Sequence, residues 1–522
     1  MLKKIVDHLS MSLSPLPPPV KVEEKEKADT FSVDLRAMEM HAPGFWKKLK
    51  TTPELLAHEY KHASGDGLPY TWQQALHYEA ATMAQTGLQL TQTKRLLNAV
   101  YDAVVDQRVA AENMDAKGMC EEWLTVYPVK PESVGTTYHL LQIIYKDLFG
   151  TNLSETSYEK SVRNSPAYRK LLSLTKNMAA GDHAVETVVE AAQIMNQLSR
   201  LDEQQGGSED VQFDRGDKEV QSEAVEAGLD AGLSGDQLAD FVGVPGDKLN
   251  ETIDSCAEDK VREALWQQIL SFKELFSGKT FMTLEETGLR PWKAYSKKID
   301  PQSIARNPSD PRKWREPVVH ETIKIEQPGE EGGFTKVILL IDCSGSTGRI
   351  YKDKTVISYI KSAAYGLIAY AKKYRIPLVT IAFSDDAMLL ANEKDNYLKH
   401  AVKLFKLRPL SNTNLDRAVH FTSKVKPDKA LIALMTDGQV RQGDIDLLLK
   451  HTNANKVVIA VVDVDQQGIN TVKAASSKAA LYIVRPDVTG KILVQYLDSV
   501  YQPEQQVAEK QQNDKTPINL FD

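Results

Sequence analysis

Two groups of residues in this chain have the types and spacing that bind metal ions, and the first group suits zinc. In His58-Glu59-Tyr60-Lys61-His62 the histidines are four positions apart, so both imidazoles face the same way on a helix. Two neutral imidazoles suit Zn²⁺, and Glu59 is placed to activate a water molecule and move its proton during amide hydrolysis. The pattern predicts zinc ligands at His58 and His62 and a catalytic base at Glu59.

A zinc site needs a third ligand, and two segments compete to supply it. Asn98, Asp102 and Asp106 recur every four residues along one stripe of a predicted helix. Asp102 would bind zinc, while Asp106 would accept a hydrogen bond from a ligand imidazole and fix its orientation. Glu79, in another helix-like stretch, is the alternative ligand. The supporting role of Asp106 favours Asp102.

The same residues also have a purely structural interpretation. His58 and His62 would then be partly exposed helix residues, Glu59 and Lys61 solvated charges, and the two aspartates a salt-bridged face. The two interpretations differ at Glu59, because replacing a general base removes activity while replacing a structural residue disturbs folding.

The second group consists of oxygen-bearing side chains that follow predicted strands. Asp342-Cys343-Ser344-Gly345-Ser346-Thr347 comes where one strand ends, Thr436-Asp437-Gly438 follows a later strand, and Thr413 precedes a helix. The carboxyl ends of parallel strands meet at one edge of a sheet, so these carboxylates and hydroxyls are expected to lie together. Since Mg²⁺ takes six oxygen ligands and readily retains waters, the cluster predicts a magnesium site.

Short β-branched runs alternate with helical patterns from Lys336 onward, which predicts a doubly wound, mainly parallel α/β sheet. The expected strands are Val337–Ile341, Leu378–Phe383, Ala430–Met435, Val457–Val464 and Leu481–Val484. The expected helices are Thr355–Tyr374, Asn414–Val425, Ile445–Thr452, Ile469–Ala479 and Gly490–Val500. Ligands in such folds bind at the carboxyl ends of the strands, where the second group of residues is found.

The overall composition is that of a soluble, multidomain protein. A chain of 522 residues is too long for one core, so two or three domains are expected. Its net charge of -7 gives no general attraction to nucleic acid or to an anionic membrane. Three widely spaced cysteines, Cys120, Cys256 and Cys343, favour neither a disulfide framework nor a thiolate zinc site, and this fits the reducing cytoplasm. We see no export signal and no run that spans a bilayer, so a cytoplasmic location is expected.

The oxygen cluster resembles the metal-ion-dependent adhesion site of von Willebrand factor A domains, through Asp-x-Ser-x-Ser, a later threonine and Thr-Asp-Gly. This resemblance implies that Ser344, Ser346 and Thr413 offer hydroxyl ligands to Mg²⁺ or Mn²⁺. Asp342 and Asp437 would bind the ion directly or through water. An acidic side chain of a protein partner would complete the metal shell. The family often has a glycine-rich approach to its threonine, whereas Ser411-Asn412 precedes Thr413 here.

The amino-terminal motif resembles the gluzincin pattern, with aspartate in place of the usual glutamate ligand. A zincin-like domain fused ahead of a von Willebrand factor A domain is similar to metallopeptidase–von Willebrand A proteins, whose relatives work with MoxR-type AAA+ ATPases. The chain has no Walker A loop, so an ATP-driven role would need a separate motor protein. We expect a metal-dependent interaction adaptor coupled to a zinc metallopeptidase domain. The alternatives are a non-catalytic scaffold for a MoxR-type ATPase and a chelatase-like complex subunit.

The predicted fold is therefore multidomain, with a mainly α zincin-like domain followed by a doubly wound α/β von Willebrand factor A domain. The expected segments are a flexible Pro-rich and charged arm (1–29), the helical zincin-like domain (30–201), an acidic linker (202–218), a helical segment with a Pro-rich connector (219–333), the von Willebrand factor A domain (334–501) and a disordered tail (502–522).

Overall fold

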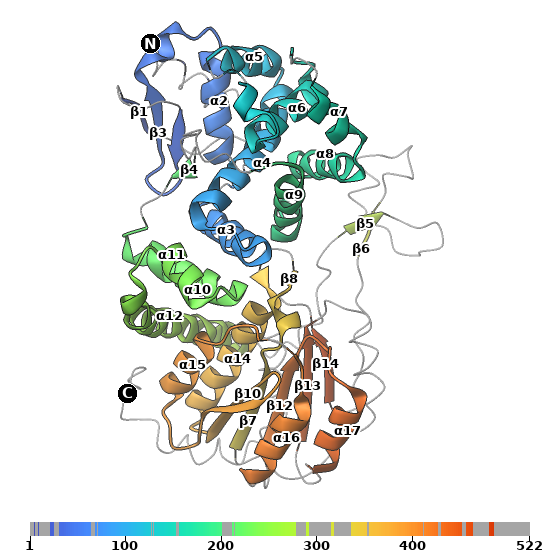
Figure 1. Ribbon diagram of the computed structural model, residues 1–522. Coiled ribbons are helices and arrows are strands. Elements are labelled where there is room, and N and C mark those ends of the chain that lie inside the picture. Colours follow the sequence, from blue (N-terminus) through green and yellow to red (C-terminus); the bar gives the residue numbers. More distant parts are fainter. Residues whose placement is uncertain are drawn as a thin grey trace. The chain divides into compact units, whose positions relative to one another are not determined.

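The computed structural model describes most of the first half of the chain and the core of the second (Figure 1). The described residues are 5, 9, 21–25, 31–63, 68–69, 71–126, 128, 130–152, 156–200, 211–212, 215–277, 289–291, 315–317, 336–351, 354–410, 412–425, 430–451, 456–462 and 480–484. The chain forms two compact units, residues 1–265 with 334–522 and residues 266–333. Among the described helices, none is both long and apolar enough for a membrane span.

A small four-stranded sheet opens the first unit, in the order β1-β3-β2-β4. Its strands are β1 (Lys21–Lys25), β2 (Ser32–Asp34), β3 (Glu39–Pro43) and β4 (Val211–Gln212). The sequence predicts a flexible arm at 1–29 and a linker at 202–218, yet β1 and β4 lie inside these ranges. Backbone pairing to β3 and β2 holds both strands, and Val22 packs against the core, so charged flanks did not prevent strand formation.

Helices make up the rest of the amino-terminal region, as the three- and four-residue periodicity predicts. They are η1 (Gly44–Lys48), α2 (Thr52–Ala63), α3 (Trp72–Thr86), α4 (Leu90–Ala111), α5 (Ala116–Val126), η2 (Pro131–Ser133), α6 (Thr137–Phe149), α7 (Ser157–Asn164), α8 (Pro166–Ala179) and α9 (Val185–Leu198). One face of α2 buries Leu56 and Tyr60 with Phe31, which precedes β2, Met40 of β3 and Val109 of α4. The core therefore fixes α2 between the sheet and α4.

The segment from 218 onward continues as helix, as its sequence predicts. It contains α10 (Lys218–Ala231), α11 (Gly235–Val242), η3 (Gly246–Lys248) and α12 (Leu249–Ser277). Asp217 caps the start of α10 by accepting from the Glu219 N–H, and Gly232 ends it with a left-handed conformation at φ 80°.

The carboxyl-terminal region of the first unit is a six-stranded sheet in the order β11-β10-β7-β12-β13-β14. Its strands are β7 (Lys336–Asp342), β10 (Leu378–Phe383), β11 (Ala387–Ala391), β12 (Ala430–Thr436), β13 (Lys456–Val462) and β14 (Ala480–Val484). All neighbours run parallel except β11, an antiparallel edge strand. Numbered within this region the order is 3-2-1-4-5-6, the order of doubly wound folds. The five predicted strands are confirmed over the described residues; 463–464, the predicted end of the fourth strand, lie outside them.

Helices cover both faces of this sheet, with α14 and α15 on one side and α16 and α17 on the other (Figure 1). Their bounds are α14 (Val356–Lys373), α15 (Tyr397–Phe405), α16 (Leu415–Lys424) and α17 (Gln442–His451). A short 3-10 turn, η5 (Gly345–Gly348), and a two-stranded ribbon, β8 (Ile350–Tyr351) with β9 (Lys354–Thr355), connect β7 to α14. Because both faces are covered, β12 is buried along its whole length.

Of the second unit, the structure describes the end of α12 and an antiparallel pair, β5 (Leu289–Pro291) with β6 (Arg315–Pro317). The rest of the predicted Pro-rich connector lies outside the described residues. So do the predicted helices Ile469–Ala479 and Gly490–Val500 and the tail at 502–522.

Candidate metal centres

Two helices position the residues of the predicted zinc motif. The α2 helix begins where Thr52 Oγ1 donates to the Trp46 carbonyl oxygen at 2.9 Å, and its apolar face packs on the sheet. The α4 helix begins with reciprocal hydrogen bonds between Gln89 and Gln92, a capping box that satisfies free backbone N–H groups. Contact between α2 and α4 brings their polar stripes together.

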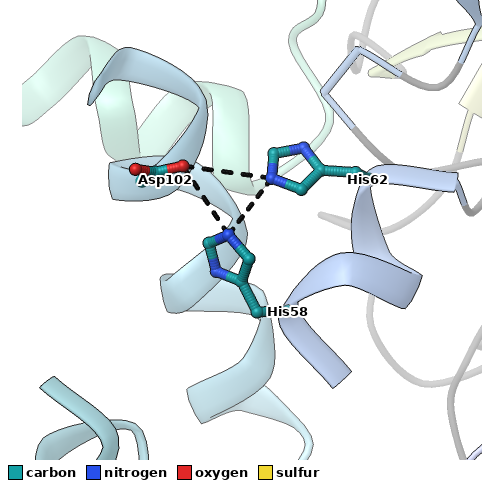
Figure 2. A group of neighbouring side chains, drawn as sticks. All are labelled: His58, His62 and Asp102. Atoms are coloured by element: carbon teal, nitrogen blue, oxygen red, sulfur yellow. Dashed lines mark hydrogen bonds and ion pairs between the residues drawn. The ribbon is translucent and has the colours of Figure 1, made fainter. Parts of the chain in front are cut away.

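His58, His62 and Asp102 converge on one point between these helices (Figure 2). The two Nε2 atoms are 3.2 Å apart, and Asp102 Oδ1 lies 3.6 Å from His58 Nε2 and 3.9 Å from His62 Nε2. Both imidazoles are buried, with exposed fractions of 9% for His58 and 0% for His62. Three ligand atoms of the kinds that zinc prefers therefore face one another away from bulk water.

The opposite nitrogen of each imidazole is held by an acceptor. His58 Nδ1 lies 2.6 Å from Asp106 Oδ1, and His62 Nδ1 lies 2.8 Å from the carbonyl oxygen of Leu68. A carboxylate and a carbonyl only accept, so both Nδ1 atoms donate, and in a neutral ring each Nε2 then carries a lone pair. With both rings neutral, two lone pairs and a carboxylate oxygen point at the same space, and a metal ion or a proton must lie among them.

The pKa values in this cluster also indicate that it needs a positive charge. Burial alone would lower the pKa of His58, but the carboxylates of Asp106 and Asp102 outweigh it and hold that pKa well above its ordinary value. Burial, with the positive charge of His58, lowers the pKa of His62 to about 3. Burial raises the pKa of Asp102 although His58 opposes the shift. With no metal ion among these ligands, one proton on His58 supplies the positive charge.

The donor set fits zinc in both chemistry and spacing. Four ligands at about 2.0–2.1 Å from a tetrahedral ion lie roughly 3.3 Å from one another; the two Nε2 atoms are 3.2 Å apart, and Asp102 Oδ1 would move closer to both, from 3.6 Å and 3.9 Å, to bind the same ion. Asp102 Oδ1 is also a buried carboxylate oxygen with no hydrogen-bond partner in the described part of the chain. A divalent ion would satisfy this oxygen and separate the facing lone pairs.

Glu59 and Lys61, which the structural interpretation expected to be solvated, are buried. Glu59 is 3% exposed and Lys61 is 1% exposed, so neither is a solvated charge. The Lys61 ammonium pairs with Glu112 Oε1 at 2.8 Å. The alternative ligand Glu79 lies elsewhere, where its carboxylate pairs with Arg215. The structure therefore brings Asp102, and not Glu79, to the two histidines.

The oxygen cluster lies at the end of β7, next to the end of β12. The Asp342 carboxylate accepts from the Ser344 N–H at 2.9 Å and from Thr436 Oγ1 at 2.6 Å. Ser344 Oγ and Ser346 Oγ are 3.0 Å apart. Asp437 accepts from the Gln439 N–H through Oδ1, while its buried Oδ2 has no hydrogen-bond partner among the described residues.

Burial and the neighbouring Asp437 carboxylate raise the pKa of Asp342 to about 7, although hydrogen bonds from Thr436 and Ser344 oppose the shift. Both carboxylates are fully buried, with exposed fractions of 0%. Two close carboxylates in a buried site repel each other unless a cation or a proton lies between them. The donor set of carboxylates and hydroxyls fits a hard divalent ion such as Mg²⁺.

Thr413 is carried to the same edge by the loop before α16. The Leu410 N–H donates to the Cys343 carbonyl oxygen at 2.7 Å, and the Asn414 N–H donates to the Ser384 carbonyl oxygen at 2.7 Å. These bonds tie both sides of the loop to the ends of β7 and β10, so Thr413 lies at the sheet edge predicted from the sequence. The strand order reverses between β7 and β12, the position at which doubly wound sheets bind ligands.

Two contacts that complete these centres were not predicted from the sequence. The Leu68 carbonyl oxygen orients His62, and no side-chain pattern could have indicated a backbone acceptor. Thr436 belongs to the quoted Thr-Asp-Gly motif, but its hydrogen bond to Asp342 depends on the pairing of β12 with β7. Register, rather than spacing along the chain, places that hydroxyl.

No protein-family model and no curated protein matches the chain. Similar solved structures include a von Willebrand factor type A structure from Catenulispora acidiphila, at 15% identity and a TM-score of 0.25, over 32% of this chain and 42% of that chain. Two structures of proximal thread matrix protein 1 from the mussel byssus have 14% identity and a TM-score of 0.26, over 32% of this chain and 47% and 48% of theirs. This chain thus spans less than half the length of each structure. The fold assignment rests on the strand order described above.

Proposed function

We propose that this protein is a zinc-dependent peptidase whose second metal centre recognises a protein partner through Mg²⁺. The observation that carries the zinc part is the convergence of two imidazole lone pairs and the Asp102 carboxylate, with both Nδ1 atoms engaged elsewhere. In a buried site, such a cluster needs a positive charge among its ligand atoms, and a metal ion supplies it where a proton on His58 does not.

The residues of α2 and α4 divide the chemistry between them. Zinc, when bound by His58, His62 and Asp102, supplies a Lewis acid that polarises a substrate carbonyl and lowers the pKa of a water molecule. Asp106 keeps the His58 ring in the tautomer and orientation that ligation needs. Glu59, which is 3% exposed, would accept the proton of the attacking water and deliver it to the leaving amine.

The experiment compares wild type, Glu59→Gln and Glu54→Gln on unfolded casein and on a mixed peptide library. We expect Glu59→Gln to lower the rate of cleavage at least a hundredfold while zinc content and thermal unfolding stay unchanged. Glu54 lies on the same helix five residues earlier and so on a different face, which makes Glu54→Gln the matched control with wild-type activity.

Three outcomes would count against this part of the proposal. If Glu59→Gln cleaves as fast as wild type, Glu59 is not the base. If wild type holds zinc but cleaves nothing in the library, the centre is a structural metal site in a scaffold. If wild type binds no zinc, the metal assignment itself is wrong.

The second part of the proposal concerns the centre at the end of β7. Its orphaned Asp437 oxygen, its paired serine hydroxyls and its position where the strand order reverses support a divalent ion with an open ligand position. A glutamate or aspartate of a protein partner would fill that position. The resemblance to metallopeptidase–von Willebrand A proteins, whose relatives work with MoxR-type AAA+ ATPases, extends the proposal to an AAA+ ATPase as partner.

Mn²⁺ titration followed by electron paramagnetic resonance tests this centre on zinc-loaded protein. We expect one Mn²⁺ per chain, displaced by excess Mg²⁺, and its loss in Asp437→Asn. Asp446→Asn, an exposed aspartate on α17, should bind Mn²⁺ like wild type. Equal binding by Asp437→Asn and wild type would remove the magnesium centre from the proposal.

A further inference from the structure

A second group of possible metal ligands lies on the small amino-terminal sheet. β1 and β3 pair in parallel, with Glu23 opposite His41 and Lys21 opposite Glu39. Residues two apart on a strand share a face, so these four side chains project together from one side of the sheet. Glu23, Glu39 and His41 each offer a ligand atom within 4.8 Å of the others.

His41 is the feature that sets this group apart from an ordinary surface ion pair. The residue is only 7% exposed, and its buried Nε2 has no hydrogen-bond partner among the described residues. Its distance to Glu39 Oε2 is 3.9 Å, beyond hydrogen-bond distance. Burial, with the nearby positive charge of Lys25, lowers the pKa of His41, so the ring is neutral and can present a lone pair.

A cation already lies between the two carboxylates. The Lys21 ammonium is 2.5 Å from Glu23 Oε1 and 3.0 Å from Glu39 Oε1. Its side chain is 61% exposed and flexible, so the pair contributes little and can be displaced. The ammonium pairs with both carboxylates, while the His41 Nε2 has no hydrogen-bond partner among the described residues.

We propose that Glu23, Glu39 and His41 bind a divalent transition-metal ion, with zinc the best fit, in place of the Lys21 ammonium. One imidazole and two carboxylates match zinc, and water would complete a four-coordinate shell. The ion would clamp β1 to β3 on the face opposite Val22 and Met40, which contact the core. This site is separate from the centre at His58 and does not rest on the proposed function.

Zinc titration calorimetry of the full-length chain tests the site, with excess Mg²⁺ present to fill the centre at β7. In a His58→Gln/His62→Gln background, which removes the ligands of the other zinc centre, we expect one remaining zinc per chain. Adding His41→Gln should weaken that binding at least tenfold. Lys21→Met should tighten it several-fold, because it removes the competing ammonium from an exposed position.

A loss of folding could only weaken zinc binding. Opposite effects of His41→Gln and Lys21→Met on the zinc affinity therefore indicate metal ligation. Lys21→Met is also measured in the otherwise unaltered chain, in case the double histidine variant does not fold. No zinc in the double histidine background, or no change on His41→Gln, would overturn the proposal. Loss of all zinc on His41→Gln in the unaltered chain would instead contradict the centre at His58.

Discussion

His58 owes its orientation to a single carboxylate. Asp106 lies one helical turn beyond Asp102 on α4 and is 2% exposed, and its Oδ1 is 2.6 Å from His58 Nδ1. That hydrogen bond turns Nε2 of the ring toward the other ligands. The negative charge of Asp106 also makes Nε2 a better electron-pair donor to a metal ion. Metal affinity at this centre therefore depends on a residue that would not touch the metal.

Asp106→Asn should weaken zinc binding by about 10–100-fold, because the amide carries no charge and holds the tautomer less firmly. Asp102→Ala, which removes a ligand, should weaken it further. Competition with a chromophoric chelator measures both affinities. Asp236→Asn, the same change at an exposed position on α11, should leave the affinity unchanged. An unchanged affinity in Asp106→Asn would contradict the orienting role of Asp106.

Asp437→Asn should stabilise the metal-free protein. It removes one of two buried carboxylates that repel each other across the end of β7, and the gain is about 1.4 kcal/mol for each unit by which the pKa of Asp342 returns toward its ordinary value. The same change should abolish the stabilisation that Mg²⁺ gives to wild type. Thermal unfolding with and without Mg²⁺ measures both effects. A lower melting temperature in metal-free Asp437→Asn would show that the second carboxylate has a structural role.

The spacing of residues along the chain was sufficient to predict which side chains share a helix face, and that the faces carrying the histidines and the aspartates would meet. His58 and His62 lie four residues apart, as do Asp102 and Asp106, so helical periodicity alone places each pair on one face. Spacing could not predict that Glu79 pairs with Arg215, a residue 136 positions away. Long-range partners depend on how helices pack, and a single sequence carries no direct record of that.

Among the elements, the strands that could be predicted are those buried on both faces of the sheet, because their sequences are continuously apolar. β7, β10 and β12 are continuous apolar runs because helices cover both sides of the sheet. The edge strand β11 and the short strands β1 and β2 were not predicted. β11 exposes Met388 and Leu389, and β1 is mostly charged, so neither has the pattern of a buried strand. Pairing with a neighbour, rather than composition, decides their conformation.

The α15 helix, also not predicted, is fixed to this sheet edge by a buried histidine. His400 is 0% exposed, its Nδ1 lies 2.9 Å from Thr380 Oγ1 on β10, and its Nε2 lies 3.1 Å from the Asn392 carbonyl oxygen. A donating Nε2 and an accepting Nδ1 describe a neutral ring. Burial accordingly lowers the pKa of His400 to about 4.

This pKa predicts that acid weakens the α15 edge of the sheet. The unfolded chain binds a proton at His400 below pH about 6.5, but the folded chain does so only below about 4, so stability falls as pH decreases between these values. The loss at pH 5 should be about 2 kcal/mol relative to pH 7.5. Hydrogen exchange of β10 and α15 peptides at both values measures it. His400→Gln should remove this part of the pH dependence, and an equal loss in that variant would contradict the assignment.

At the scale of the first unit, α10 is bonded both to the helices of the zinc region and to the sheet that carries the second centre. Glu223 pairs with His77 of α3 at 3.5 Å. Asp230 pairs with Lys361 of α14 at 2.5 Å, and Ser358 donates to the same carboxylate at 2.5 Å. Lys361 also donates to the Phe405 carbonyl oxygen at 2.9 Å. Since the side chains of Asp230 and Lys361 are 6% and 5% exposed, neither charge has access to much water.

Breaking this buried pair should therefore destabilise α10 and α14 together. Asp230→Ala leaves the Lys361 ammonium buried without its carboxylate, which typically costs about 3–5 kcal/mol. The double variant Asp230→Leu/Lys361→Met should recover most of that loss, because an apolar pair of similar size avoids the desolvation of both charges. Urea unfolding gives the free energies, and hydrogen exchange shows whether α10 and α14 peptides lose protection in the same variant. Asp236→Ala, exposed on α11, is the matched control.

Two outcomes would contradict this role of the ion pair. The double variant could be no more stable than Asp230→Ala, or only the α10 peptides could lose protection. In either case the contact between α10 and α14 does not depend on this ion pair, and the centres at His58 and Asp342 fold independently.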